Sequence, residues 1–201
     1  IKVIDRAENT LKEYPNTVFK NELMLYQIRS YHQLGEFEKV LALSKRFLRE
    51  FSSDPGLAEV LTYTANAYSK IGQITDADYF FDRLFDEQGD SPFAPQGMIY
   101  KAEQLETNGE PKKAAQYYKK ALSSTTDVAI ASKAAFKLAQ SELMSGDIQK
   151  AAQYVDKIIT VNPNYLSEVT DDAINMATSF MDKKDPKTAA RLTEALLNKS
   201  D

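Results

Sequence analysis

The spacing of glycines is the feature of this sequence that most constrains its fold. Four of the seven glycines recur every 37 residues, at Gly35, Gly72, Gly109 and Gly146. Alanine, valine or isoleucine stands seven residues before and five residues after each of them, and these eight positions are Ile28, Val40, Ala65, Ala77, Ala102, Ala114, Ala139 and Ala151. A fixed period of this length is the signature of a repeat architecture, in which each unit is one supersecondary element.

Composition and helix-start signals predict that the units are helical. Gly and Pro number only 7 each among 201 residues, and β-branched residues form no alternating runs. Candidate N-cap residues keep the same period at Thr17, Asp54 and Ser91, and we expect Asp127 and Asn164 to take the role one position earlier than the period. The predicted helices are 1–14, 18–34, 37–51, 55–71, 74–88, 92–108, 111–124, 128–145, 148–161, 165–183 and 186–198.

One unit, residues 98 to 122, resembles a tetratricopeptide repeat (TPR). The resemblance lies in a small residue in the first helix, a turn glycine, and small residues in the second helix, here Ala102, Gly109, Ala114 and the Ala121-Leu122 pair. It implies an all-α, right-handed α-solenoid of stacked helix-turn-helix repeats that works by binding protein. The usual TPR period is about 34 residues, and we expect the additional residues to lengthen the first helix of each repeat by one turn.

The register divides the chain into a single TPR array over 1–201. Residues 1–16 match the second helix of a truncated repeat, so we expect the chain to have been cut within an array. Complete repeats follow at 17–53, 54–90, 91–126 and 127–163, and a divergent one at 164–201. In that last repeat the string KDPKTA (184–189) copies GEPKKA (109–114), with Lys184 in place of the turn glycine.

Charge and residue usage argue against several function classes. A formal net charge of -4 disfavours binding to nucleic acid, so the lysines of 112–120 are interpreted as the exposed face of a second helix. The absence of Cys removes thiol chemistry, and His32 is the only histidine. The acidic residues near Asp76 lack the glycine spacing of a calcium loop. We therefore expect no enzyme activity, no cofactor, no metal site and no direct membrane insertion.

A tyrosine series marks the candidate partner-binding surface. Tyr26, Tyr63 and Tyr100 share the 37-residue spacing, and the resemblance implies that this position and the one three residues later face the concave groove. Those companion residues are Arg29, Asn66, Glu103 and Gln140. Tyrosine suits recognition because it offers a large contact area and a polar tip. The alternative is that the three rings pack on each other and are structural.

The resemblance also suggests a carboxylate clamp, in which Lys and Asn side chains hold the C-terminal acid of a partner. Its positions correspond here to Thr62, Asn66, Tyr100, Lys133 and Lys137. Two of the characteristic residues are missing, and a solvated basic face is the alternative interpretation of the two lysines.

These features predict a non-enzymatic scaffold that binds a partner protein or peptide along its concave groove. The alternative is a structural spacer or self-association module, and under self-association the chain forms a homo-oligomer. The strings YPNT (14–17) and GDSPFAP (89–95) resemble inter-repeat turns of bacterial envelope TPR proteins, such as outer-membrane assembly lipoproteins and flagellar-motor scaffolds. This favours a periplasmic location, with the cytoplasm as the alternative.

Overall fold

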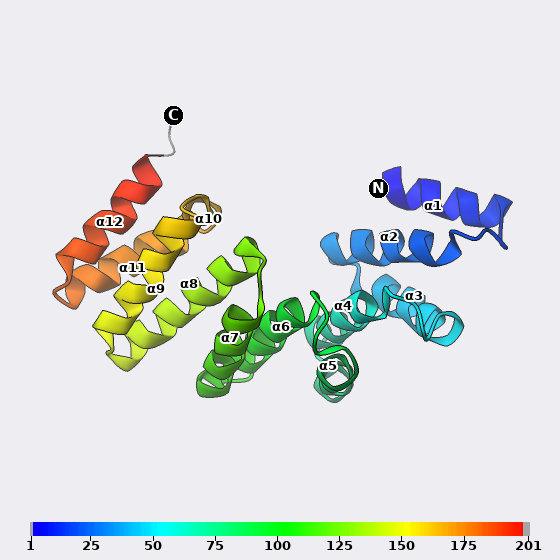
Figure 1. Cartoon of the computed structure of the whole chain (residues 1–201), viewed down its shortest axis with the longest axis horizontal. Helices are drawn as coiled ribbons and strands as arrows, with labels where there is room; N and C mark the ends of the chain where they lie inside the picture. Colours follow the sequence, from blue (N-terminus) through cyan, green and yellow to red (C-terminus); the bar gives the residue numbers. More distant parts are fainter. Residues whose placement is uncertain (1, 199–201) are drawn as a thin grey trace. The chain divides into compact units, whose positions relative to one another are not determined.

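The computed structural model describes residues 2–198, which form α-helices joined by turns and contain no β-strand (Figure 1). The helices are α1 (Lys2–Glu13), α2 (Lys20–Gln33), α3 (Phe37–Glu50), α4 (Leu57–Lys70), α5 (Ile74–Gln88), α6 (Ala94–Thr107), α7 (Pro111–Ser124), α8 (Val128–Ser145), α9 (Ile148–Val161), α10 (Asn164–Glu168), α11 (Thr170–Asp182) and α12 (Pro186–Leu197). The predicted all-α, α-solenoid fold class is confirmed.

Most predicted helix boundaries agree with the structure to within two residues. The prediction of one helix over 165–183 is wrong, because the helix is interrupted at Val169, whose φ of -123° and ψ of 40° are not helical. The N-cap prediction for Asn164 is also wrong. This residue is the first of α10, where Pro163 stands at the cap position without a side-chain hydrogen bond.

Left-handed turns join the two helices of each repeat. The four periodic glycines have φ between 73° and 91°, and Lys184 adopts the same conformation with a φ of 65°. At each turn the next residue donates its N–H to a carbonyl five positions earlier, as Glu110 does to Leu105 and Asp185 to Phe180, both at 2.8 Å. This is the helix-ending bond of a Schellman motif, so all five turns have one geometry.

Side-chain hydrogen bonds form a turn ahead of α2, α4 and α6, and this turn accounts for the length of the repeat. The cap residues of α2 and α4 are Phe19 and Gly56, so the N-cap prediction for Thr17 and Asp54 is wrong by two positions. The hydroxyl or carboxylate oxygens of Thr17, Asp54 and Ser91 each accept a hydrogen bond from the backbone N–H two residues later, at 3.4, 2.7 and 3.2 Å. The residues that follow these three form a turn before the helix begins. Asp127 caps α8 directly, as predicted.

The predicted lengthening of the first helix is therefore wrong for three repeats. Helices α2, α4 and α6 have 14 residues each, as many as the second helix α3. Among the first helices of the described repeats, only α8, with 18 residues, exceeds this length. In the other repeats the additional residues belong to this turn. The side chain of its first residue bonds an N–H outside the helix, and the carbonyl of the same residue bonds the N–H of the first helical residue.

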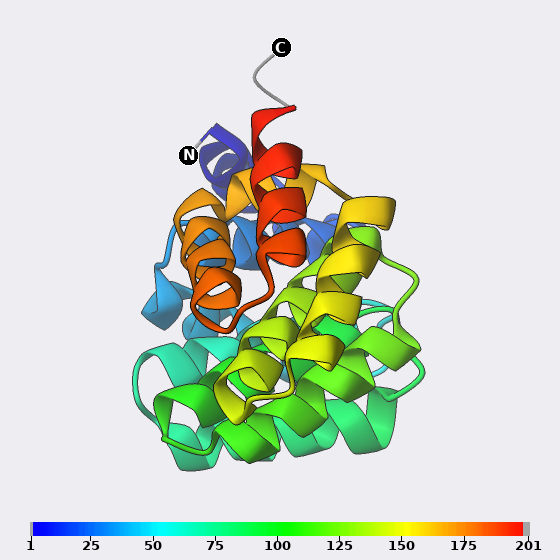
Figure 2. The ribbon, with the colours of Figure 1, turned by 90° about the vertical axis from the view of Figure 1, so that its left-hand side faces the viewer.

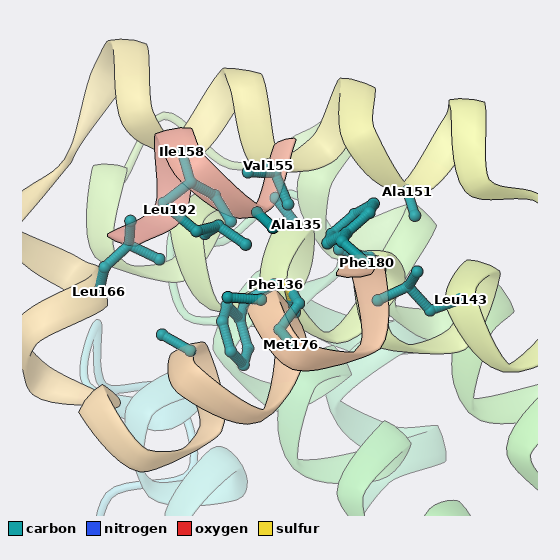
Figure 3. Close-up of a cluster of buried hydrophobic side chains, with 14 of the residues drawn as sticks. Ala135, Phe136, Leu143, Ala151, Val155, Ile158, Leu166, Met176, Phe180 and Leu192 are labelled. Carbon is teal, nitrogen blue, oxygen red and sulfur yellow. The ribbon is translucent and has the colours of Figure 1, made fainter. Parts of the chain in front are cut away.

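The chain divides into two compact units, residues 1–100 and 101–201, with the boundary inside α6. Met24, Ile28, Phe47 and Phe81 belong to the core of unit 1. In unit 2, α8 packs on α9 and α11 on α12 (Figure 2). Side chains of these four helices and of α10 form the core drawn in Figure 3. That both units continue one array over the whole chain stays a prediction.

The residues that flank the periodic glycines lie where the helices cross. All eight of the alanine, valine and isoleucine positions are buried, with an exposed fraction of at most 1%. A larger side chain at such a crossing would overpack it. The repeated pattern in the sequence therefore records helix packing.

The left-handed turn at Lys184 predicts a stabilising substitution. Lys184→Gly removes the steric cost of a non-glycine residue at positive φ and should raise the free energy of unfolding by about 0.5 to 1 kcal/mol. Lys183→Gly is the matched control, because Lys183 has a right-handed φ of -88° and gains only backbone entropy in the unfolded chain. Urea denaturation should show the control to be less stable than wild type. Equal effects of the two substitutions would contradict this account.

Candidate functional site

Unit 1 places three of the predicted groove residues, Tyr63, Tyr100 and Asn66, around the imidazole of His32. The His32 ring on α2 lies 4.5 Å from the Tyr63 ring on α4 and 5.6 Å from the Tyr100 ring on α6, centroid to centroid. Phe37 meets the same imidazole edge-on at 6.0 Å. The packing of Tyr63 and Tyr100 against His32 was not predicted from the sequence.

Asn66 holds this imidazole in place. His32 Nε2 donates to Asn66 Oδ1 at 2.8 Å, and the Asn66 side chain is buried, with its Nδ2 atom lacking a hydrogen-bond partner. Burial lowers the pKa of His32, the positive charge of Lys70 acts in the same direction, and the hydrogen bond to Asn66 opposes them. The neutral imidazole is therefore the form that fits this site.

Arg29 is also engaged within unit 1. Its guanidinium binds Glu59 through two hydrogen bonds of 2.8 and 3.0 Å, and Glu59 is only 4% exposed. The same guanidinium lies 5.6 Å from the centre of the Tyr26 ring. Of the tyrosine series, Tyr26 has the most accessible ring, at 49% exposed, whereas Tyr63 and Tyr100 are half-buried.

The structure does not support the carboxylate clamp. Thr62 is fully buried and its hydroxyl donates to the Ala58 carbonyl at 2.9 Å, so it faces helix backbone and has no free surface. Asn66 is held by His32, as described above. In unit 2 the Lys133 ammonium lies 2.6 Å from the Glu103 carboxylate, and Lys137 lies 3.1 Å from Glu106. The two lysines already have anionic partners.

In unit 2, Glu106 is the centre of a small polar network between α6, α7 and α8. Besides the Lys137 ammonium, it accepts a hydrogen bond of 3.0 Å from the Tyr118 hydroxyl. Burial and the negative charge of Glu106 both raise the pKa of Tyr118, so this hydroxyl stays protonated and keeps donating. The Glu106 carboxylate is thus balanced by one cation and one hydrogen bond.

A cavity of about 620 Å³ opens beside this network, within unit 2. One wall is a stripe of α8 with helical spacing, formed by Lys137, Gln140, Ser141 and Met144. Two of these residues, Lys137 and Gln140, were predicted to face the groove. Met144 is 84% exposed, which places a large apolar side chain at the rim.

The opposite wall comes from α11, and α7 closes the cavity. Asp172, Asn175 and Met176 line it from α11, and Ala115 and Tyr118 from α7. Met176 and Tyr118 are buried, so the floor is apolar and the rim is polar.

Sequence reasoning missed the α11 wall, although the register contained a signal for it. The tyrosine position recurs as Lys137 after 37 residues and as Asn175 after 38, the same one-residue shift that separates Lys184 from the glycines. The one-residue shift hides this equivalence, because Asn175 falls outside the strict 37-residue spacing.

Two searches found nothing: no family model matches the chain, and no curated protein matches it. Comparison with solved structures gave matches along almost the whole chain. BtubC (BKLC) from P. vanneervenii superimposes with a TM-score of 0.71 at 16% identity, over 98% of this chain and 86% of that one. The chain has a TPR-like helical-repeat fold.

The second neighbour, from the APC/C hetero-tetramer Cut9-Hcn1, has a TM-score of 0.61 at 17% identity and covers 97% of this chain. The TPR-like chain spans only 34% of that protein's length. At these identities the likeness concerns the fold alone. The resemblance to bacterial envelope TPR proteins stays a prediction.

Two further observations concern residues 2–198. None of their helices combines the length and the apolar composition needed to cross a bilayer. In the same part of the chain, no three His, Asp or Glu side chains lie close enough together to hold a metal ion.

The lowered pKa of His32 predicts a pH dependence of stability. The unfolded chain has the ordinary histidine pKa of about 6.5, so as the pH falls below this value the unfolded state takes up a proton first. The free energy of unfolding should therefore be at its full value above about pH 6.5 and should decrease below it. Urea denaturation of wild type at pH 7.5 and 5.5 measures this decrease.

His32→Gln is the control, because the chain has no other histidine. The variant keeps every carboxylate but cannot take up the proton, so its loss of stability between pH 7.5 and 5.5 should be smaller than that of wild type. An equal loss in both proteins would show that His32 does not titrate in this way.

Proposed function

We propose that this protein is a non-enzymatic scaffold that binds a partner protein or peptide along the first-helix face of its repeats. The observation that carries the proposal is the cavity of unit 2, about 620 Å³ in volume, between α7, α8 and α11. It has an apolar floor, a polar rim and two of the residues that the repeat register selects, Lys137 and Gln140. This composition suits an interface in which an apolar anchor is surrounded by polar contacts.

The side chains with catalytic potential support a binding role. The chain has no Cys, and the imidazole of its single histidine packs against two tyrosine rings and is bonded to Asn66. General acid–base catalysis needs such a group to be within reach of a substrate. We therefore include the absence of enzyme activity in the proposal.

The structural neighbours are consistent with work in an assembly. One of them was solved as part of a hetero-tetramer, the APC/C complex Cut9-Hcn1. A helical-repeat fold supplies long surfaces, because each unit contacts only its neighbours and leaves one face of its first helix available. We extend this use to the present chain as a proposal, with a protein partner and without nucleic acid.

Filling the cavity tests the proposal. Ser141→Trp places an indole on the α8 wall, where the residue is half-buried, and should reduce retention of the partner at least tenfold. Gln116→Trp is the matched control, since Gln116 is exposed on α7 outside the cavity. The measurement is quantitative mass spectrometry of proteins retained by the full-length protein in extracts of its own cells. A partner retained equally by all three proteins would exclude the cavity as its binding site.

A structural spacer or self-association module is the second candidate. An apolar groove of about 730 Å³ between α11 and α12, flanked by the exposed side chains of Ile174, Met181 and Leu197, favours it. Sedimentation over a hundredfold concentration range separates the two candidates. A monomer throughout would remove self-association, whereas dimers lost on Met181→Glu would support it.

We also propose that the protein works in the bacterial envelope, in an outer-membrane or motor assembly. The support is limited to the two inter-repeat turn strings at 14–17 and 89–95. Fractionation of cells that produce the full-length protein tests this. Recovery in the periplasmic fraction would agree with the proposal, and recovery with cytosolic markers would contradict it.

A further inference from the structure

We infer that the unit 2 cavity takes an extended acidic peptide segment whose apolar side chain enters between Met144 and Met176 and whose carboxylate side chains meet Lys112 and Lys183. This inference rests on the proposed function and specifies its partner. It is argued from the charges, the floor and the dimensions of the cavity.

The charges that line the cavity are unequally compensated. Three lysines line it, and one of them, Lys137, is paired with Glu106, which Tyr118 also binds. Lys112 and Lys183 are both exposed, and no described carboxylate lies within ion-pairing distance of either. Two uncompensated positive charges therefore remain for a partner to meet.

These two lysines lie at the same end of the cavity. Lys112 follows the turn at Gly109 by three residues, and Lys183 immediately precedes the turn at Lys184. In stacked repeats of this kind the turns between first and second helices share one edge. The remaining charge, Asp172, is near the start of α11 and hence at the opposite end. A segment that is acidic at one end and basic at the other matches this polarity.

The middle of the cavity is suited to an apolar side chain. Buried Met176 and Tyr118 form its floor, and Met144 stands 84% exposed above them. Methionine is unbranched and adapts its shape, so a pair of methionines can close around aliphatic side chains of several shapes. An exposed apolar residue next to such a floor is typical of a contact surface.

The length of the cavity fits a short extended segment. Asp172 and Lys183 are separated by 11 positions of helix, or roughly 16 Å at 1.5 Å per residue. A strand-like segment of about five to six residues, at roughly 3.3 Å each, spans the distance.

Blocked synthetic peptides test the inference on the full-length protein. The probe is Lys-Ser-Leu-Ser-Glu-Glu in both chain directions, with neutral ends so that only side-chain carboxylates are acidic. NMR titration should show binding of at least one direction, with shifts of the Gln140 and Asn175 side-chain amide signals, which line the cavity. The affinity should fall at high salt, because exposed charges are screened.

Variants locate the acidic end. Lys112→Glu with Lys183→Glu should weaken binding about tenfold, as expected for reversing two exposed charges. Lys187→Glu is the matched control, because Lys187 is an exposed lysine of α12 outside the cavity. Met144→Ser should also weaken binding. Because Met144 is 84% exposed, this substitution should leave the fold intact, and a lower affinity would report the lost contact.

Two results would overturn the inference: equal binding of the charge-swapped peptide Glu-Ser-Leu-Ser-Lys-Lys, or unchanged affinity in the double lysine variant. Failure here is distinguishable from failure of the proposed function. If Ser141→Trp abolishes retention of the partner while none of the peptides binds, the cavity is the binding site and only the partner chemistry inferred for it is wrong.

Discussion

The left-handed turn between paired helices is the constraint on which the rest of this structure depends. It reverses the chain within a few residues, so the second helix returns against the first and the alanines on either side of the turn meet. At the four glycines an added Cβ would meet no atom within 4 Å. Backbone conformation, and not crowding, is therefore what selects glycine there. Lys184 shows that one repeat keeps the geometry at an energetic cost.

The two units use the equivalent face of their first helices in different ways. In unit 1 the face is filled from within, because His32 occupies the space beside Tyr63 and Tyr100 and Arg29 is committed to the buried Glu59. In unit 2 the corresponding position carries Lys137 and Asn175, and a cavity is open beside them. Large aromatic side chains pack with their neighbours, whereas shorter polar ones leave space and hydrogen-bonding groups for a ligand.

Local signals explain why the fold could be predicted from the sequence. Glycine at positive φ, a capping side chain and a small residue at a crossing each act within one repeat, so a single chain reveals them four times over. The break at Val169 had no comparable signal, since neither Gly nor Pro marks it. The site was harder to predict because it depends on which neighbours a side chain finds. Asn66 was expected to face a ligand and instead bonds His32, which lies 34 positions away in the sequence.

The position that carries Tyr26, Tyr63, Tyr100, Lys137 and Asn175 is separate from the positions that build each repeat. Turn glycines and small residues at the crossings determine that the helices pack, and under the proposed function this one position per repeat determines what the surface presents. Under the proposed function, single substitutions there would change what the protein recognises while its architecture is inherited unchanged. The recognition surface and the fold would then be free to change independently of each other.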